Sequence, residues 1–60
     1  MDAQRAQEIA NSPNMINVTH KGSLIYIEHV DQDKQIATIH PLDNPNNKQS
    51  VRVENLTELP

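Results

Sequence analysis

The chain has 60 residues, with five Lys or Arg against eight Asp or Glu, so its formal net charge is −3, the wrong sign for binding phosphate backbones. Its length allows one small domain, residues 1–60, and a hydrophobic fraction of 35% provides only a thin core. The sequence has no cysteine and a single glycine, which excludes disulfides, thiolate zinc sites, cysteine nucleophiles and glycine-rich nucleotide-binding loops.

Residues 2 to 11 show the spacing of an amphipathic helix. Asp2 is a suitable N-cap, because its carboxylate can accept hydrogen bonds from the free amides of the first turn. Pro13 disfavours the helical conformation at Ser12 and ends the helix there. The apolar positions recur at three- and four-residue intervals: Ala3, Ala6, Ile9 and Ala10. We therefore predict a short N-terminal helix that packs on the rest of the fold through Ile9.

After Pro13 the period of the pattern changes to two, which predicts four strands over residues 15–20, 24–30, 35–40 and 50–54. A turn around Gly22, which is free to take a positive φ, separates the first two strands. Pro41 opens a polar loop that runs to residue 49. We expect residues 55–59 to form a single helical turn seated by Leu56.

The second strand is apolar on both faces, which is typical of a central or bent strand. One face carries Leu24, Tyr26 and Val30, and the other carries Ile25 and Ile27. We predict that the core contains these four residues in particular: Ile25, Ile27, Val51 and Val53.

These elements predict an α+β fold, with a short N-terminal helix followed by a four-stranded antiparallel meander or a small, partly open β-barrel. An open sheet leaves two edges of unpaired amides and carbonyls, so we expect weak homodimerisation through the last strand. The longest apolar run, residues 24–27, is too short to span a bilayer, and the N-terminus does not have the pattern of a signal peptide. We expect no membrane association.

Three histidines are the available nitrogen ligands for a metal: His20, His29 and His40. His29 and His40 could approach one another across adjacent strands, near Asp31 or Asp33, as in a mixed imidazole and carboxylate site. All three lie at predicted strand ends or turns, where polar residues are ordinary, so we expect no metal site and no cofactor.

The sequence contains the residue types of a serine hydrolase but not the motif that arranges them. The chain has three serines, Ser12, Ser23 and Ser50, but no G-x-S-x-G elbow, and so small a core cannot enclose a substrate. We expect no catalytic residue.

The cations Lys21, Lys34, Lys48 and Arg52 are interleaved with acidic residues, which favours a solvated surface over a basic patch. Tyr26 is the single aromatic side chain, so stacking on bases has little support. Nucleic-acid binding is therefore a minor alternative for the function, although the sequence leaves open a local positive potential around Lys21, Lys48 and Arg52.

A further pattern runs nearly from end to end. It consists of Arg5-Ala6-Gln7-Glu8-Ile9 with Ser12-Pro13, Gly22 ahead of Ile25-Tyr26-Ile27, then Val30, Ala37, Ile39, Leu42, Val51, Val53, Leu56 and Glu58. In this order within a chain of this length, the residues resemble the H-type small acid-soluble spore proteins of Bacillus and related spore formers. The resemblance implies accumulation in the forespore and location in the spore core, with no defined catalytic activity and no functional residues to carry over. The DNA-saturating α/β-type spore proteins are a different sequence family.

The sequence therefore favours a non-enzymatic sporulation protein of the dormant spore core, whose molecular role is undefined. Two alternatives stay open: a small β-barrel module associated with nucleic acid, and a self-associating interaction domain. The expected partner is an unidentified protein or a second copy in a weak homodimer.

Overall fold

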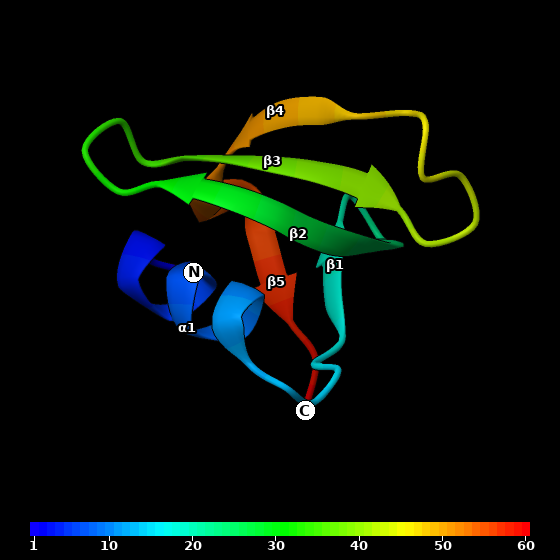
Figure 1. Cartoon of the computed structure of the whole chain (residues 1–60), viewed down its shortest axis with the longest axis horizontal. Coiled ribbons are helices and arrows are strands. Elements are labelled where there is room, and N and C mark those ends of the chain that lie inside the picture. Colours follow the sequence, from blue (N-terminus) through cyan, green and yellow to red (C-terminus); the bar gives the residue numbers. More distant parts are fainter.

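Helix α1 (Ala3–Asn11) confirms the predicted N-terminal helix in the computed structural model, which describes all of residues 1–60. Asp2 caps the helix, because its carboxylate accepts a hydrogen bond from the amide of Arg5 at 2.7 Å. The helix ends where Ser12 turns to an extended conformation ahead of Pro13. Its buried residues lie on the predicted apolar stripe: Ala3, Ala6 and Ile9. This stripe packs against the sheet (Figure 1).

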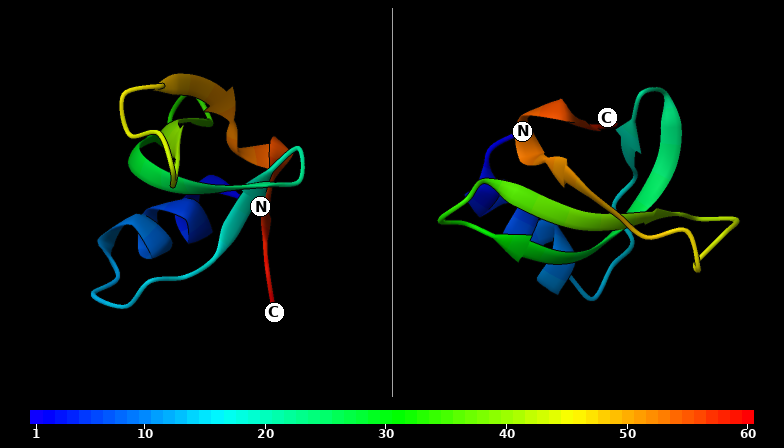
Figure 2. Two further views of the ribbon diagram at one scale, coloured as in Figure 1. Left: turned by 90° about the vertical axis from the view of Figure 1, so that its right-hand side faces the viewer. Right: turned by 90° about the horizontal axis from the view of Figure 1, so that it is seen from above.

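The rest of the chain forms one antiparallel sheet of five strands in the order β4-β3-β2-β1-β5. The elements are β1 (Val18–His20), β2 (Ser23–Asp31), β3 (Ile36–Pro41), β4 (Gln49–Arg52), the 3-10 turn η1 (Val53–Asn55) and β5 (Leu56–Glu58). Strands β2, β3 and β4 lie side by side across the molecule in alternating directions, whereas β1 and β5 run steeply across them (Figures 1 and 2). The sheet is thus curled into a half-barrel, and the α+β prediction is confirmed with five strands in place of four.

The C-terminal tail corrects the sequence prediction. Strand β4 ends at Arg52, the helical turn is η1, and the segment predicted to be helical forms strand β5 beside β1. Leu56 does anchor the tail, since it is 1% exposed, but it does so as the first residue of a strand. A three-residue strand has too weak a local pattern to predict, because its stability comes from pairing with a distant segment.

The turn between β1 and β2 has the expected geometry. Lys21 and Gly22 have φ values of 53° and 82°, and His20 pairs with Ser23 on either side of them. Two consecutive positive φ values mark the primed turn whose twist matches a two-residue hairpin. A Cβ atom on Gly22 would meet nothing within 4 Å, so backbone conformation alone favours glycine there.

A β-bulge in β2 corrects the predicted strand faces. The register shifts between Ile27 and His29, so Glu28 is an extra residue opposite β3. After the bulge the alternation is inverted, and Val30 joins Ile25 and Ile27 on the inner face instead of sharing a face with Tyr26.

The core lies between α1 and the concave face of the sheet. It contains Ala3, Ala6, Ile9, Val18, Ile25, Ile27, Val30, Ala37, Ile39, Val53 and Leu56, with Val51 partly buried against it. The predicted core positions Ile25, Ile27 and Val53 are confirmed, whereas Val51 is only half-buried because it lies on edge strand β4. The nine-residue helix α1 is far too short to cross a bilayer.

Arg5 fastens the helix to the far end of the sheet. Its Nε and Nη2 atoms donate to the two carboxylate oxygens of Glu58 at 2.9 and 2.6 Å, and its Nη1 donates to Glu8 at 3.1 Å. The hydrogen bond from Arg5 lowers the pKa of Glu58, and the two carboxylates together raise the pKa of Arg5. The two-pronged pairing joins the first helix to the last strand, which are more than 50 residues apart.

Candidate functional site

Three ionisable side chains meet on the outer face of the sheet and form what we call the Glu28 cluster: Glu28, His40 and Lys48. One carboxylate oxygen of Glu28 lies 2.6 Å from Nδ1 of His40, and the other lies 3.3 Å from Nζ of Lys48. Glu28 lies two residues after Tyr26 on the outer face of β2, and Tyr26 pairs with His40 of β3, so Glu28 and His40 are diagonal neighbours across the two strands.

Hydrogen bonding and charge favour the ionised form of Glu28. The hydrogen bond from His40 lowers the pKa of Glu28, partial burial works against this, and Lys48 lowers it further. The Glu28 side chain is 25% exposed and that of His40 15%, so the pair is shielded but still open to solvent. Because a carboxylate can only accept, Nδ1 of His40 is the donor in this contact.

Tyr26 borders the Glu28 cluster on strand β2. It pairs with His40 across β2 and β3, and the two ring centres are 5.2 Å apart at an interplanar angle of 33°. Tyr26 is 48% exposed, so the ring covers one side of the imidazole while its own outer side faces solvent.

A carboxylate that orients an imidazole is part of a general-base arrangement, which also needs a nucleophile within hydrogen-bond reach. The serines do not supply one. Ser12 accepts a hydrogen bond from the amide of Asn14 at 3.2 Å at the end of the helix, while Ser23 and Ser50 are exposed on β2 and β4. No serine hydroxyl is hydrogen-bonded to a histidine.

The histidines and aspartates weighed for metal binding do not converge. His40 is held by Glu28 rather than lying near Asp31 or Asp33, and Asp31 instead accepts the amide of Lys34 at 3.1 Å within the turn after β2. His29 is exposed opposite Thr38. Nowhere do three histidine or carboxylate side chains come together in a way that could hold an ion.

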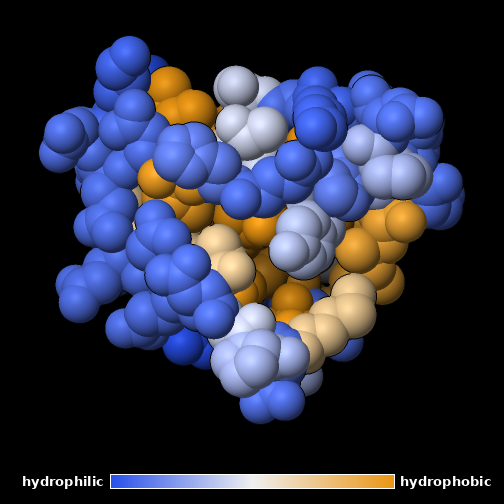
Figure 3. Space-filling view, in the orientation of Figure 1, coloured by the Kyte–Doolittle hydropathy of each residue, from blue (hydrophilic) through white to orange (hydrophobic).

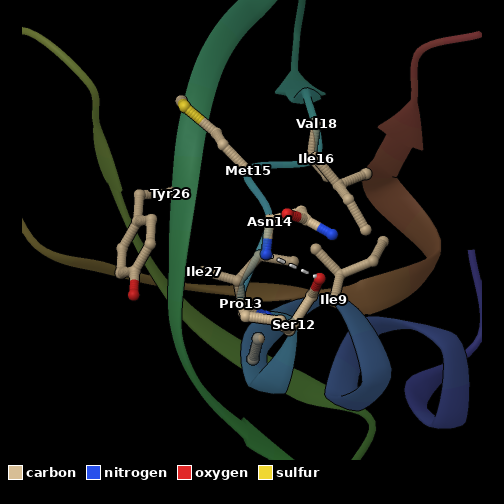
Figure 4. A pocket seen from close by; sticks show the side chains of 10 residues that line it. Ile9, Ser12, Pro13, Asn14, Met15, Ile16, Val18, Tyr26 and Ile27 are labelled. Atoms are coloured by element: carbon tan, nitrogen blue, oxygen red, sulfur yellow. Dashed lines mark hydrogen bonds between the residues drawn. The ribbon is translucent and has the colours of Figure 1, made fainter.

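A shallow apolar groove of about 280 Å³ lies between the end of α1 and strands β1 and β2. Seven of its ten lining residues are hydrophobic, among them Ile9, Ile16, Val18 and Ile27. Hydrophobic atoms are visible in a hollow of the surface framed by hydrophilic side chains (Figure 3). Ile9, Ile16 and Val18 gather on the helix side of the groove, while Tyr26 stands beyond β2 (Figure 4).

The groove exists because the segment after the helix does not fill the space beside β2. Pro13 and Asn14 carry the chain away from α1, and Met15 is 68% exposed at the rim. The hydrogen bond from Asn14 to the Ser12 hydroxyl fixes this bend. The sequence assigned residue 15 to a strand, but the first strand begins at Val18 and leaves the preceding residues free to line the groove.

Comparison with known proteins now defines the family. Residues 1–58 match the small acid-soluble spore protein H family. The chain is 71% identical over 58 residues to small, acid-soluble spore protein H 1 of Geobacillus kaustophilus, covering 97% of each chain. It is 45% identical over 58 residues to small, acid-soluble spore protein H of Bacillus subtilis, covering 97% of this chain and 98% of that one.

The chain belongs to the small acid-soluble spore protein H family. The resemblance seen in the sequence is thereby confirmed, and the H-family proteins are spore proteins by name. No solved structure matches the chain.

In this H-family protein most of the cationic side chains form ion pairs with carboxylates. Lys48 pairs with Glu28, and Arg52 lies 3.3 Å from Glu54. Lys21 and Lys34 occupy the two β-turns at different corners of the sheet. Two of the three cations of the possible positive patch, Lys48 and Arg52, therefore each lie beside a carboxylate.

Sequence reasoning missed both the Glu28 cluster and the groove of this H-family protein. Glu28 and His40 are 12 residues apart, and the pairing of β2 with β3 brings their side chains together. The sequence signal for the bulge is Val30, an apolar residue out of phase with Ile25 and Ile27, which is equally typical of a strand that is apolar on both faces.

Proposed function

We propose that this H-family protein is a non-enzymatic component of the dormant spore core that acts through surface contacts rather than catalysis. The observation that carries the proposal is the match of residues 1–58 to a family of spore proteins. The geometry supports it, since the imidazole of the Glu28 cluster bonds a carboxylate and no serine hydroxyl.

Location in the core is tested by fractionating spores. The chain, carrying a short epitope after the exposed residue Pro60, is expressed during sporulation of Bacillus subtilis, whose own family member is 45% identical. We expect the epitope to stay with spores after their coats are extracted and to be released when the decoated spores are lysed. Recovery in the coat extract would contradict the proposal.

The non-enzymatic part is tested with the purified chain and an activated ester such as p-nitrophenyl acetate, a general reporter of nucleophilic and basic side chains. We expect hydrolysis no faster than with an equal concentration of free imidazole groups, and an unchanged rate in His40→Gln beyond the loss of one such group. A rate far above that baseline which His40→Gln abolishes would show that the Glu28 cluster is catalytic.

A further inference from the structure

Strand β4 (Gln49–Arg52) is an open edge of the sheet. The strand order places β4 at one end, with β3 on one side of it and no strand on the other. It forms the upper margin of the molecule (Figure 1). Gln49, Ser50 and Arg52 are exposed, and only Val51 is half-buried. An exposed strand edge is a template for pairing with another strand.

The register identifies the backbone groups that are free on this edge. The amide of Val53 donates to the carbonyl of Gln35 at 3.1 Å, which fixes the alternation of the ladder between β3 and β4. In an antiparallel pair, alternate residues turn their amide and carbonyl toward the neighbouring strand. Gln49 and Val51 therefore bond to β3, while the amides and carbonyls of Ser50 and Arg52 point outward.

The opposite edge of the sheet, at β5, is obstructed. The N-terminal ammonium lies 3.4 Å from the carbonyl of Leu56, and the Arg5 guanidinium covers the side chain of Glu58. The strand is also only three residues long. Of the two edge strands, β4 is therefore the more accessible for pairing with another strand.

A second copy of the chain fits this edge in one register. If Val51 lies opposite Val51 of the second copy, Ser50 of each copy lies opposite Arg52 of the other. Each of these two pairs exchanges two hydrogen bonds between backbone amides and carbonyls, which gives four in total. The same register places Lys48 of each copy opposite the segment that carries Glu54 of the other. Opposite charges therefore approach one another at both ends of the paired strands.

The neighbouring registers bring like charges together. Shifting the pairing so that Ser50 lies opposite Ser50 places Arg52 opposite Lys48 of the second copy. Shifting it the other way places the two Arg52 side chains directly opposite one another. Like charges directly opposite are destabilising in an antiparallel pair, so charge selects the register centred on Val51.

We propose that two copies of this protein pair antiparallel through β4, centred on Val51, to form one continuous sheet. The contact surface is small and each copy carries a net charge of −3, so the association is weak. A dimer is expected to be detectable at about 1 mM and largely dissociated at tenfold or greater dilution.

The first test uses sedimentation velocity at about 1 mM with the proline variant Ser50→Pro. The substitution removes an outward amide that β3 does not use, so the monomer should keep its fold and the dimer should be lost. Ser50→Thr is the matched control, since it keeps the amide and suits a strand. A parent chain that is strictly monomeric, or a Ser50→Pro variant that is folded and dimerises like the parent, would overturn the proposal.

The second test identifies the register and does not depend on proline. In the proposed pairing, Ser50→Glu places a carboxylate opposite Arg52 of the second copy twice per dimer, and should tighten association on the order of threefold or more. Ser50→Lys should weaken it by a similar factor. Net charge alone would give the opposite order, because the Glu variant is more acidic. If Ser50 instead lies opposite Ser50, both variants should weaken the dimer. If Arg52 lies opposite Arg52, the Lys variant should tighten it. Either outcome would overturn the pairing centred on Val51.

Discussion

Replacing Ile27 by alanine probes the core where β2 meets β3. Ile27 is 3% exposed and lies opposite Ile39, which is 1% exposed. The substitution deletes three carbons, and at ~0.8 kcal/mol for each the loss of transfer free energy is about 2.4 kcal/mol. Cavity formation raises such costs to ~2–5 kcal/mol, and the groove that Ile27 lines lets its surroundings relax, so we expect about 2–4 kcal/mol.

That loss is large for this chain. A 60-residue domain has a total stability of about 3–9 kcal/mol, so Ile27→Ala should remove about a fifth of it or more and lower Tm by roughly 15–30 °C. Thermal and urea unfolding followed by circular dichroism measure both quantities. Leu24→Ala is the matched control in the same strand, since Leu24 is 43% exposed, and should cost under about 1 kcal/mol. If Ile27→Ala melts like the parent, or Leu24→Ala is equally costly, the placement of the inner face of β2 is wrong.

Three further predictions concern charge and ligands. Because the pKa values of Glu28 and Glu58 are lowered in the folded chain, the stability they add is fully present above the ordinary carboxyl pKa near 4.5 and is lost as pH falls through the folded values. Tm should therefore fall in acid, and less steeply in Glu58→Gln; parallel curves would contradict the role of the Arg5 pair. Isothermal titration with Zn²⁺ should give no stoichiometric site of micromolar or tighter affinity, whereas a site that His29→Ala and His40→Ala abolish would refute this. A gel shift at low salt should show no submicromolar binding of DNA or RNA, and such binding would favour the nucleic-acid alternative.

The parts of the fold that the sequence could predict are those set by local physics. Ala3, Ala6 and Ile9 share a helix face whatever they pack against, Asp2 is a capping residue, and Pro13 stops the helix. Lys21-Gly22 forms the predicted turn because glycine readily takes the positive φ that a two-residue hairpin needs.

The parts it could not predict depend on contacts distant in sequence. Thr57 is in a strand because it pairs with Thr19 of β1, and the tail alone has no pattern that distinguishes a strand from a turn. The bulge at Glu28 is fixed by the pairing of β2 with β3, and it decides which face Val30 takes.

The polar site depended on the same contacts. The sequence allows His40 as a metal ligand beside Asp31 or Asp33, but the pairing of β2 with β3 gives it Glu28 as its partner. The charge of Lys48 could be read from the sequence, but its commitment to Glu28 could not, because the loop of residues 42–48 intervenes between β3 and β4.

Amide hydrogen exchange on β4, followed by NMR at two protein concentrations, tests most directly the claim that this curled sheet is completed by a second copy. At about 50 μM, where the chain is monomeric, the amides of Val51 and Val53 should be protected by β3 and those of Ser50 and Arg52 should exchange freely. At about 1 mM, the amides of Ser50 and Arg52 should gain protection while those of Val51 and Val53 change little. Protection of Ser50 and Arg52 that is the same at both concentrations would contradict the pairing, and free exchange at Val51 would contradict the fold itself.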